Sequence, residues 1–232
     1  MQRYKTFFIL QVIAHIITEF PTKFGIPRQS GIIETLRGTI VFEPEYRNPD
    51  AVRGLEEFSH LWLIWEFSEA KRESWSPTVR PPRLGGNVRK GVFATRSPFR
   101  PNPIGLSSVK LEKIVMDPKL GPVLHVSGAD LMDGTPIYDI KPYIVYTDSH
   151  PEAVSGFAEK PAEQLLEVND PGGLLLEVDE SHRESLLAVL AHDPRPQYQD
   201  DPDRIYGMAF GPYEVRFKVE DLDLTVVDIK KM

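Results

Sequence analysis

Proline is the feature that most restricts the fold of this chain, because 21 of its 232 residues are proline, roughly twice the usual share of about 5%. Proline removes a backbone donor and clashes with the preceding helical turn, so long helices cannot dominate. Between the prolines lie short apolar runs rich in β-branched residues and bounded by Gly, Asn and Asp. Runs of this kind are typical of strands joined by turns, so we expect a mainly β fold.

Seven such runs predict strands in the first part of the chain. They are Phe7–Ile17, Gly38–Phe42, His60–Phe67, Gly91–Thr95, Ser107–Val115, Val123–Ser127 and Thr135–Ile140. A short helix is predicted over Pro49–Leu55. The first run is shorter than the roughly 20 apolar residues of a membrane span, and no small-residue cleavage site follows it. We therefore expect a buried strand there, in a soluble cytoplasmic protein.

The second part of the chain predicts a helix and two strands. The sequence Ser181-His182-Arg183-Glu184 has the pattern of a capping box, which predicts a helix that begins after Ser181 and ends before Asp193-Pro194. Residues Tyr213–Val219 alternate strictly and predict a strand paired antiparallel with Leu222–Ile229. We expect three parts: an antiparallel β-barrel domain over 1–148, a linker and domain edge over 149–170, and a small α+β domain over 171–232.

Several classes of site are excluded by absent residues. The chain has no cysteine, which excludes disulfides, thiolate metal sites and a cysteine nucleophile. It has neither GxGxxG nor GxxxxGK[ST], which argues against a Rossmann or P-loop nucleotide site. The six histidines show no HExxH or HxH spacing, so no metal site is expected.

The charge is distributed unevenly along the chain. The net charge is −7, yet residues 71–100 hold eight basic residues and one acidic residue, whereas residues 148–203 are strongly acidic. Local potential rather than total charge steers a polyanion toward a protein. The basic stretch is interleaved with Trp75, Phe93, Phe99 and several prolines. Rigid backbone, guanidinium groups and aromatic rings together suit phosphate contacts and base stacking, although a solvated basic loop has the same charge.

Four segments carry more polar chemistry than scaffolding needs. Pro27-Arg28-Gln29 offers donors on a stiff loop, although a plain turn has the same pattern, and His60 opens an apolar strand, where a core histidine is the simpler interpretation. The stretch 80–105 is dense in Arg, Asn, Gly and Pro, which favours a functional loop. Residues 130–143 hold Asp130, Asp133 and Asp139 around a hairpin turn, and these carboxylates can bind hydroxyls, an ammonium group or a proton.

These segments resemble the TsaA/YaeB-like family of bacterial tRNA methyltransferases, the TrmO family. The resemblance rests on PRQ (Pro27–Gln29), DAVRGLEEFSHLW (Asp50–Trp62), PTVRPPRLGGN (Pro77–Asn87), GVFATRSPFRPNPIG (Gly91–Gly105), DLMDGTPIYDIKPY (Asp130–Tyr143) and DPRPQY (Asp193–Tyr198). It covers nearly the whole chain. The departure is at the N-terminus, where Ala14 and Ile17-Thr18-Glu19 replace the family's frequent Gly and its Arg/Ser-Pro turn.

The resemblance implies an S-adenosylmethionine-dependent methyltransferase on a β-barrel. Its implied substrate is N6-threonylcarbamoyladenosine, the modified base 3′ of the anticodon at tRNA position 37, chiefly in a threonine tRNA. The reaction adds a methyl group to N6 of this base. It also implies a homodimer without metal. The implied cofactor residues are Pro27, Arg28, Gln29, His60, Leu61, Arg96, Leu106, Asp130, Leu131, Asp133 and Gly134. For catalysis, Asp133 or Asp139 is the candidate proton acceptor, with Tyr138 and Asn102 as orienting groups. The expected tRNA contacts are Arg80, Arg83, Arg89, Arg100, Arg195 and Tyr198.

Two rival functions stay open at this point. A non-catalytic RNA-binding barrel would use the same basic loop, with steep salt dependence and no cofactor affinity. A second methyltransferase of the same cofactor class would act on a different substrate.

Overall fold

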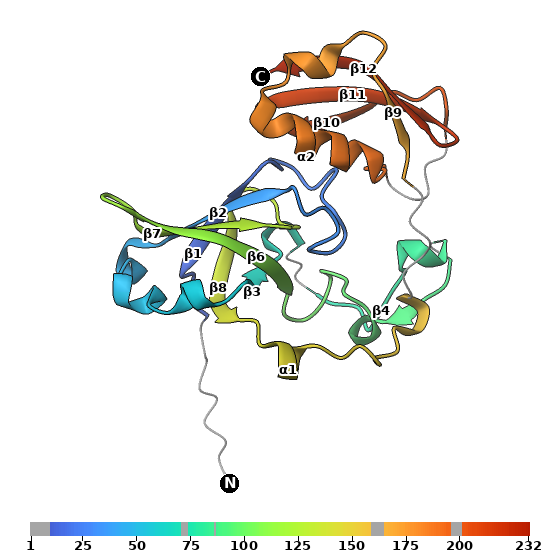
Figure 1. The fold of residues 1–232 in the computed structure, drawn as a ribbon. Coiled ribbons are helices and arrows are strands. Elements are labelled where there is room, and N and C mark those ends of the chain that lie inside the picture. The colour runs from blue at the N-terminus through green and yellow to red at the C-terminus, as the bar shows by residue number, and fades with distance from the viewer. Residues whose placement is uncertain (1–9, 71–73, 86, 159–164, 196–200) are drawn as a thin grey trace.

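The fold consists of a closed barrel and a separate small sheet (Figure 1). The computed structural model describes residues 10–70, 74–85, 87–158, 165–195 and 201–232. The barrel has the strand order β1-β2-β7-β6-β3-β8, and every neighbouring pair is antiparallel. Its strands are β1 (Ala14–Thr18), β2 (Arg37–Phe42), β3 (His60–Glu66), β6 (Ile104–Asp117), β7 (Gly121–Ser127) and β8 (Thr135–Pro142). The expected mainly β fold with an antiparallel barrel is confirmed.

Alternation of side chains along the strands builds the barrel core. On β3, Leu61 and Leu63 are fully buried, while the alternating residues Trp62 and Ile64 point away from the barrel interior and are half-buried. Because successive side chains of a strand point to opposite faces, one apolar residue in two is enough to fill the barrel. The same alternation buries Ile40 on β2, so the period of two in the sequence becomes the inside and outside of the barrel.

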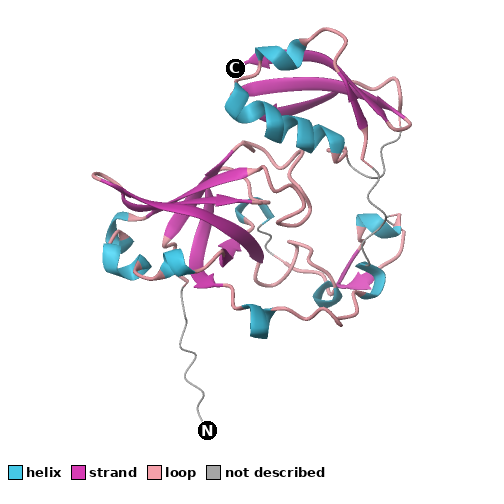
Figure 2. Ribbon diagram, in the orientation of Figure 1, coloured by secondary structure: helices cyan, strands magenta, loops and turns pink. Residues whose placement is uncertain are grey.

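The C-terminal unit is a four-stranded sheet covered by one helix (Figure 2). Its strand order is β10-β11-β12-β9. Its elements are β9 (Glu167–Asn169), α2 (Glu180–Ala191), β10 (Tyr206–Phe210), β11 (Tyr213–Glu220) and β12 (Asp223–Lys231). The expected antiparallel pairing of the last two strands is confirmed. Strand β9, which lies in the segment expected to be a linker, runs parallel to β12.

The segment between β1 and β2 connects the barrel to this unit. Phe20, Ile33 and Leu36 are buried in the same core as the apolar face of α2 and the C-terminal sheet. The Ser185 hydroxyl of α2 donates a hydrogen bond of 2.8 Å to the Thr35 carbonyl. The second core therefore contains residues from both ends of the chain, which fixes the C-terminal unit against the barrel.

Three local expectations were wrong. The expected strand Phe7–Ile17 begins at Ala14, because its partner β2 ends at Phe42, opposite Ala14; residues 1–9 lie outside the described residues. The expected helix Pro49–Leu55 is instead two 3-10 turns, Pro49–Val52 and Leu55–Glu57, separated by Gly54 with a left-handed φ of 84°.

The third correction concerns the expected capping box. Helix α2 begins at Glu180 with Asp179 at its N-cap, so Ser181 lies inside the helix, where its hydroxyl is 3.0 Å from Nδ1 of His182. The amide of Asp179 donates instead to the Tyr213 hydroxyl, at 3.0 Å. A tertiary contact from the sheet thus takes the place that the sequence pattern assigned to a local cap.

Among the described residues, no helix is long and apolar enough to cross a membrane. The short helix α1 (Val145–Asp148) follows the last barrel strand in the sequence. Strands β4 (Thr78–Val79) and β5 (Lys90–Gly91) form a separate two-stranded sheet.

Candidate active site

A large cavity of about 1670 Å³ lies where the basic stretch faces the barrel. Its walls come from residues 28–29, the end of β3, residues 74–103 and residues 154–158. Among the described residues that line it, five are arginines and one, Glu66, is acidic. The five arginines are Arg28, Arg80, Arg89, Arg96 and Arg100. The cavity therefore has the positive potential that attracts phosphate or carboxylate groups.

The β4–β5 hairpin supports one wall of this cavity. Thr78 pairs with Gly91, and the Val92 amide extends the pairing with a 2.9 Å hydrogen bond to the Pro77 carbonyl. The expected strand Gly91–Thr95 was wrong, because β5 ends at Gly91 and Val92–Ala94 form a 3-10 turn. Its partner β4 is only two residues long and is bounded by prolines, which cannot donate to a ladder.

Two predicted residues that are 67 positions apart meet at the cavity. The Arg96 guanidinium donates through Nη1 to Oε1 of Gln29. The loop that carries Gln29 is in turn fixed to the barrel, since the Ser30 hydroxyl accepts a 3.1 Å hydrogen bond from the Ser108 amide, and the Gly31 amide donates to the Gly128 carbonyl at 2.9 Å. The structure therefore brings the Pro27–Gln29 loop into contact with the basic stretch, and both segments were expected to hold cofactor residues.

A chain of hydrogen bonds connects the barrel interior to Asp130. The Trp65 indole donates to the Ser107 hydroxyl at 2.9 Å, and that hydroxyl donates to Oδ1 of Asp130 at 2.6 Å. Burial raises the pKa of the Asp130 carboxyl, while the Ser107 hydrogen bond and the charge of Arg96 lower it in part. Asp130 is thus an oriented acceptor that lies within the electrostatic reach of Arg96. Sequence reasoning missed Ser107 and Trp65 because each is separated from Asp130 by more than 20 residues.

Tyr138 and Asp139 have different neighbours although they are adjacent on β8. Burial, and then the hydrogen bond and charge of Glu66, raise the pKa of Tyr138 to about 12. Tyr138 is therefore a neutral phenol at pH 7 that faces a cavity-lining carboxylate. Asp139 pairs with Nζ of Lys141 at 2.9 Å and accepts from the Ile140 amide.

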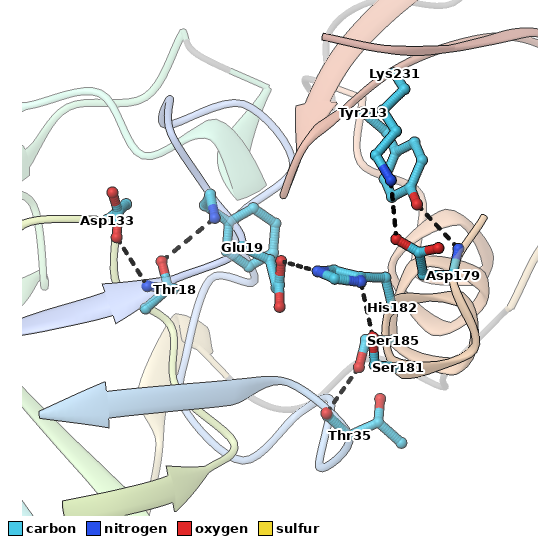
Figure 3. A network of polar contacts seen from close by, with 11 residues as sticks. Thr18, Glu19, Thr35, Asp133, Asp179, Ser181, His182, Ser185, Tyr213 and Lys231 are labelled. Atoms are coloured by element: carbon cyan, nitrogen blue, oxygen red, sulfur yellow. Dashed lines mark hydrogen bonds and ion pairs between the residues drawn. The ribbon is translucent and has the colours of Figure 1, made fainter. Parts of the chain in front are cut away.

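Thr18 and Glu19 lie between Asp133 and helix α2 of the C-terminal unit (Figure 3). Oδ1 of Asp133 accepts from the Thr18 amide at 3.0 Å, and the Thr18 hydroxyl donates to the Leu131 carbonyl at 3.0 Å. Next to Thr18, Oε2 of Glu19 lies 3.2 Å from Nε2 of His182 on α2. Gly134 occupies the turn with φ 73°, a conformation that favours glycine. The turn is thus held by Thr18, the last residue of β1.

Of the described residues that were predicted for the site, only Arg28, Gln29, Arg80, Arg89, Arg96 and Arg100 line the cavity. Asp130, Asp133, Gly134, Tyr138 and Asp139 lie outside its lining, as do the other described residues that were predicted. Leu61 and Leu131 are buried in the barrel core, whereas His60, Asn102 and Leu106 are exposed. Arg195 makes a bidentate contact with Asp193, with Nε–Oδ1 at 2.9 Å and Nη2–Oδ2 at 3.0 Å. Pro27 directly precedes the cavity-lining Arg28. The side chain of Arg83 and the whole of Tyr198 lie outside the described residues.

One wall of the cavity was missed by sequence reasoning. Val154, Ser155, Phe157 and Ala158 line it, although they fall in the segment interpreted as a linker. Nζ of Lys90 lies 5.6 Å from the centroid of the Phe157 ring, so this segment lies against the hairpin. The available signal was a lone aromatic residue within an acidic stretch.

No group of three or more His, Asp or Glu suited to a metal occurs in the described part of the chain.

Comparison with known proteins gives consistent results. The family model of the tRNA-methyltransferase O N-terminal domain matches residues 15–149, and that of the TrmO C-terminal domain matches residues 175–232. A tRNA (adenine(37)-N6)-methyltransferase from Escherichia coli (strain K12) is 40% identical over 227 residues, covering 94% of this chain and 96% of that protein. A putative S-adenosylmethionine-dependent methyltransferase from Pseudomonas aeruginosa is 38% identical, with coverage of 94% and 95%. A crystal structure of TrmO from Pseudomonas aeruginosa has a TM-score of 0.77 at 31% identity, covering 97% of this chain and 99% of that one.

Proposed function

This chain belongs to the tRNA-methyltransferase O family, and on that premise we propose that its arginine-lined cavity is the active site. The protein is an S-adenosylmethionine-dependent enzyme that methylates N6 of adenine 37 in tRNA. The observation that carries the location is the contact between Gln29 and Arg96, two expected cofactor residues that both line the cavity with its five arginines. An anticodon loop presents unpaired bases, so such a cavity can receive the target without opening a duplex.

The residues around Asp130 fit S-adenosylmethionine chemically. This cofactor has ribose hydroxyls, an ammonium group and a carboxylate, which match the Asp130 carboxylate, the Gln29 amide and the Arg96 guanidinium in type. When bound, it supplies a methyl group on a positively charged sulfonium. The task of the protein is then to align donor and acceptor, and alignment alone can provide effective molarities of about 10⁵ M or more. The fixed loop at Ser30 and the Trp65–Ser107–Asp130 chain are suited to that task.

We propose that the acceptor is N6-threonylcarbamoyladenosine, and that cavity arginines hold its carboxylate and the flanking phosphates. Arg80 and Arg89 are both exposed on the hairpin wall, where a guanidinium can bind phosphate or carboxylate oxygens in a bidentate manner. Arg100 also supports the loop, because its Nη1 donates to the Thr95 carbonyl at 2.9 Å. Acidic residues elsewhere on the chain would repel the rest of the tRNA and favour docking at this wall.

The candidate proton acceptors lie on β8 and on the turn that precedes it. We propose that neutral Tyr138 orients the acceptor through the polar contact it shares with Glu66. Asp139 and Asp133 are the two candidate proton acceptors, and the amide variants Asp139→Asn and Asp133→Asn distinguish them. The variant of the true acceptor is expected to lose turnover by about 100-fold or more. Asp139→Asn should do so at unchanged cofactor affinity, because Asp139 is not one of the expected cofactor residues.

We further propose a cytoplasmic homodimer that prefers a threonine tRNA. Ile104 and Leu106 lie on the same face of β6 and are 37% and 58% exposed, which supports a covered apolar face. Sedimentation equilibrium of wild type and Leu106→Glu tests the dimer, since a charge on this face is expected to yield monomer. An unchanged mass would argue against that interface.

The experiment that tests the function uses purified protein, S-adenosylmethionine and tRNA from a strain that lacks the enzyme. Mass spectrometry of the digested nucleosides is expected to show threonylcarbamoyladenosine gaining one methyl group. Methylation of another nucleoside would refute the substrate assignment. Saturable tRNA binding without cofactor binding in calorimetry would support the RNA-binding barrel instead.

A further inference from the structure

Two aromatic rings stand exposed at the wall of the cavity. Trp75 is 50% exposed and Phe93 is 72% exposed, and both line the cavity. Their ring centroids are 6.0 Å apart and their planes differ by 33°. Single exposed apolar residues are ordinary, but two neighbouring rings that both face a charged cavity form an apolar surface that a ligand can cover.

The hairpin sets the direction of both rings. Trp75 lies just before β4 and Phe93 just after β5, so the pairing of Thr78 with Gly91 brings them together. Val92, directly before Phe93, is only 1% exposed, which anchors the turn while Phe93 points outward. The rings are therefore held in place by backbone pairing and not by burial of the rings themselves.

The surroundings of the rings identify the ligand chemistry. Arg89 lies on the same wall and is fixed by a 2.8 Å hydrogen bond from its Nη1 to the Thr78 hydroxyl. Open aromatic faces beside guanidinium groups are the combination by which proteins hold single-stranded nucleic acid, with the base on the ring and the phosphate on the cation. The cavity, at about 1670 Å³, exceeds the roughly 300–1,000 Å³ of a typical small-molecule site. It therefore has room for a nucleotide besides the cofactor and the acceptor.

We propose that Phe93, supported by Trp75, is a stacking platform for an unpaired base next to adenosine 37 in the anticodon loop. This inference rests on the proposed function, because it assumes that the cavity receives that loop. The platform binds a neighbour of the methylated base and so sets the position of the loop in the cavity. Stacking is tolerant of base identity, since every base has a π face.

The test compares variants that keep or remove the ring face. Phe93→Leu keeps apolar bulk but has no π face, and Phe93→Tyr keeps the π face. Tyr146→Leu is the matched control, because Tyr146 is 89% exposed and does not line the cavity. Affinity for an anticodon stem-loop RNA is measured by fluorescence anisotropy over a range of salt concentrations. We expect Phe93→Leu to weaken binding about tenfold at an unchanged salt slope, and Phe93→Tyr and Tyr146→Leu to match wild type.

Abasic RNAs then locate the stacked base. If one flanking base stacks on Phe93, its removal abolishes the difference between wild type and Phe93→Leu. Equal affinity of wild type and Phe93→Leu, a penalty that persists with every abasic RNA, or coupling to adenosine 37 alone would overturn the platform. Cofactor affinity, measured by calorimetry, is expected to be unchanged in Phe93→Leu. Failure of wild type to methylate tRNA would refute the proposed function itself, whereas normal methylation with an indifferent Phe93→Leu would refute the platform alone.

Discussion

Gly105→Ala tests whether the Trp65–Ser107–Asp130 chain is as rigid as its geometry indicates. Gly105 on β6 lies opposite Trp65 on β3. A Cβ at this position would lie 2.3 Å from Cε2 and 2.4 Å from Cζ2 of the indole. Contacts this short are not tolerated, so the ring must move, and Trp65 is only 7% exposed within the barrel core.

The cost of this movement has two parts. Forcing one extra carbon into a packed core costs about 1–3 kcal/mol. Displacing the indole also breaks its 2.9 Å hydrogen bond to Ser107, a loss of about 0.5–1.5 kcal/mol. The free energy of unfolding should therefore fall by about 2–4 kcal/mol, measured as a lower midpoint in urea denaturation. Because Ser107 also holds Asp130, cofactor affinity measured by calorimetry should fall as well.

A matched glycine provides the control. Gly91 has a φ of −56°, and no neighbouring atom would lie within 4 Å of an alanine Cβ at this position, so Gly91→Ala should change stability by less than about 0.5 kcal/mol. In the double variant Gly105→Ala with Trp65→Phe, the smaller ring should make the combined cost less than the sum of the two single costs. If Gly105→Ala unfolds at the wild-type urea concentration, the indole is free to relocate, and the inferred rigidity of the chain is refuted.

Three further predictions concern the charged residues. Arg96→Ala should reduce methyl transfer by about 100-fold or more with a nearly unchanged thermal midpoint, because Arg96 is exposed and acts in positioning; full activity would show that it is misassigned. Affinity for tRNA falls as salt rises, and Arg80→Ala should make the slope of log affinity against log salt less steep by about one. A loss of cofactor affinity instead would assign Arg80 to the cofactor. Asp130→Asn should be more stable than wild type at pH 7. The pKa of Asp130 is raised in the folded protein, so the wild-type fold loses stability as the pH rises from the ordinary pKa of the carboxyl through the raised one, whereas the amide does not titrate. Urea midpoints at pH 4 and pH 7 check this, and an advantage that grows toward low pH would contradict it.

The barrel could be predicted from the sequence because its strands carry a period of two. His60–Glu66 alternates so regularly that its bounds came within one residue of those expected. Gly91–Thr95 looked equally β-rich, yet a strand needs a partner of matching length, and the proline-bounded β4 offers only two residues. Local pattern therefore fails where a distant segment decides how far pairing extends.

The candidate site divides in the same way. The residue types at Gln29, Arg96 and Asp130 were apparent from the sequence, because rigid polar loops are costly without a function. Their mutual contacts were not, since the fold alone brings Gln29 to Arg96 and Ser107 to Asp130. Phe157 was missed because cavity walls are defined by space, and no local period marks them.

The C-terminal unit contributes to the site through a segment that it holds. The Thr18 amide donates to the Asp133 carboxylate. The backbone carbonyl of the next residue, Glu19, accepts a 2.6 Å hydrogen bond from the Gly211 amide, and its carboxylate pairs with His182. Burial raises the pKa of Glu19, while the charge of His182 offsets part of that rise. Because Thr18 and Glu19 are consecutive, a single peptide unit separates the contact with α2 from the contact with the turn that carries Asp133. The unit that completes the second core therefore also holds the residues next to the turn expected to bind the cofactor.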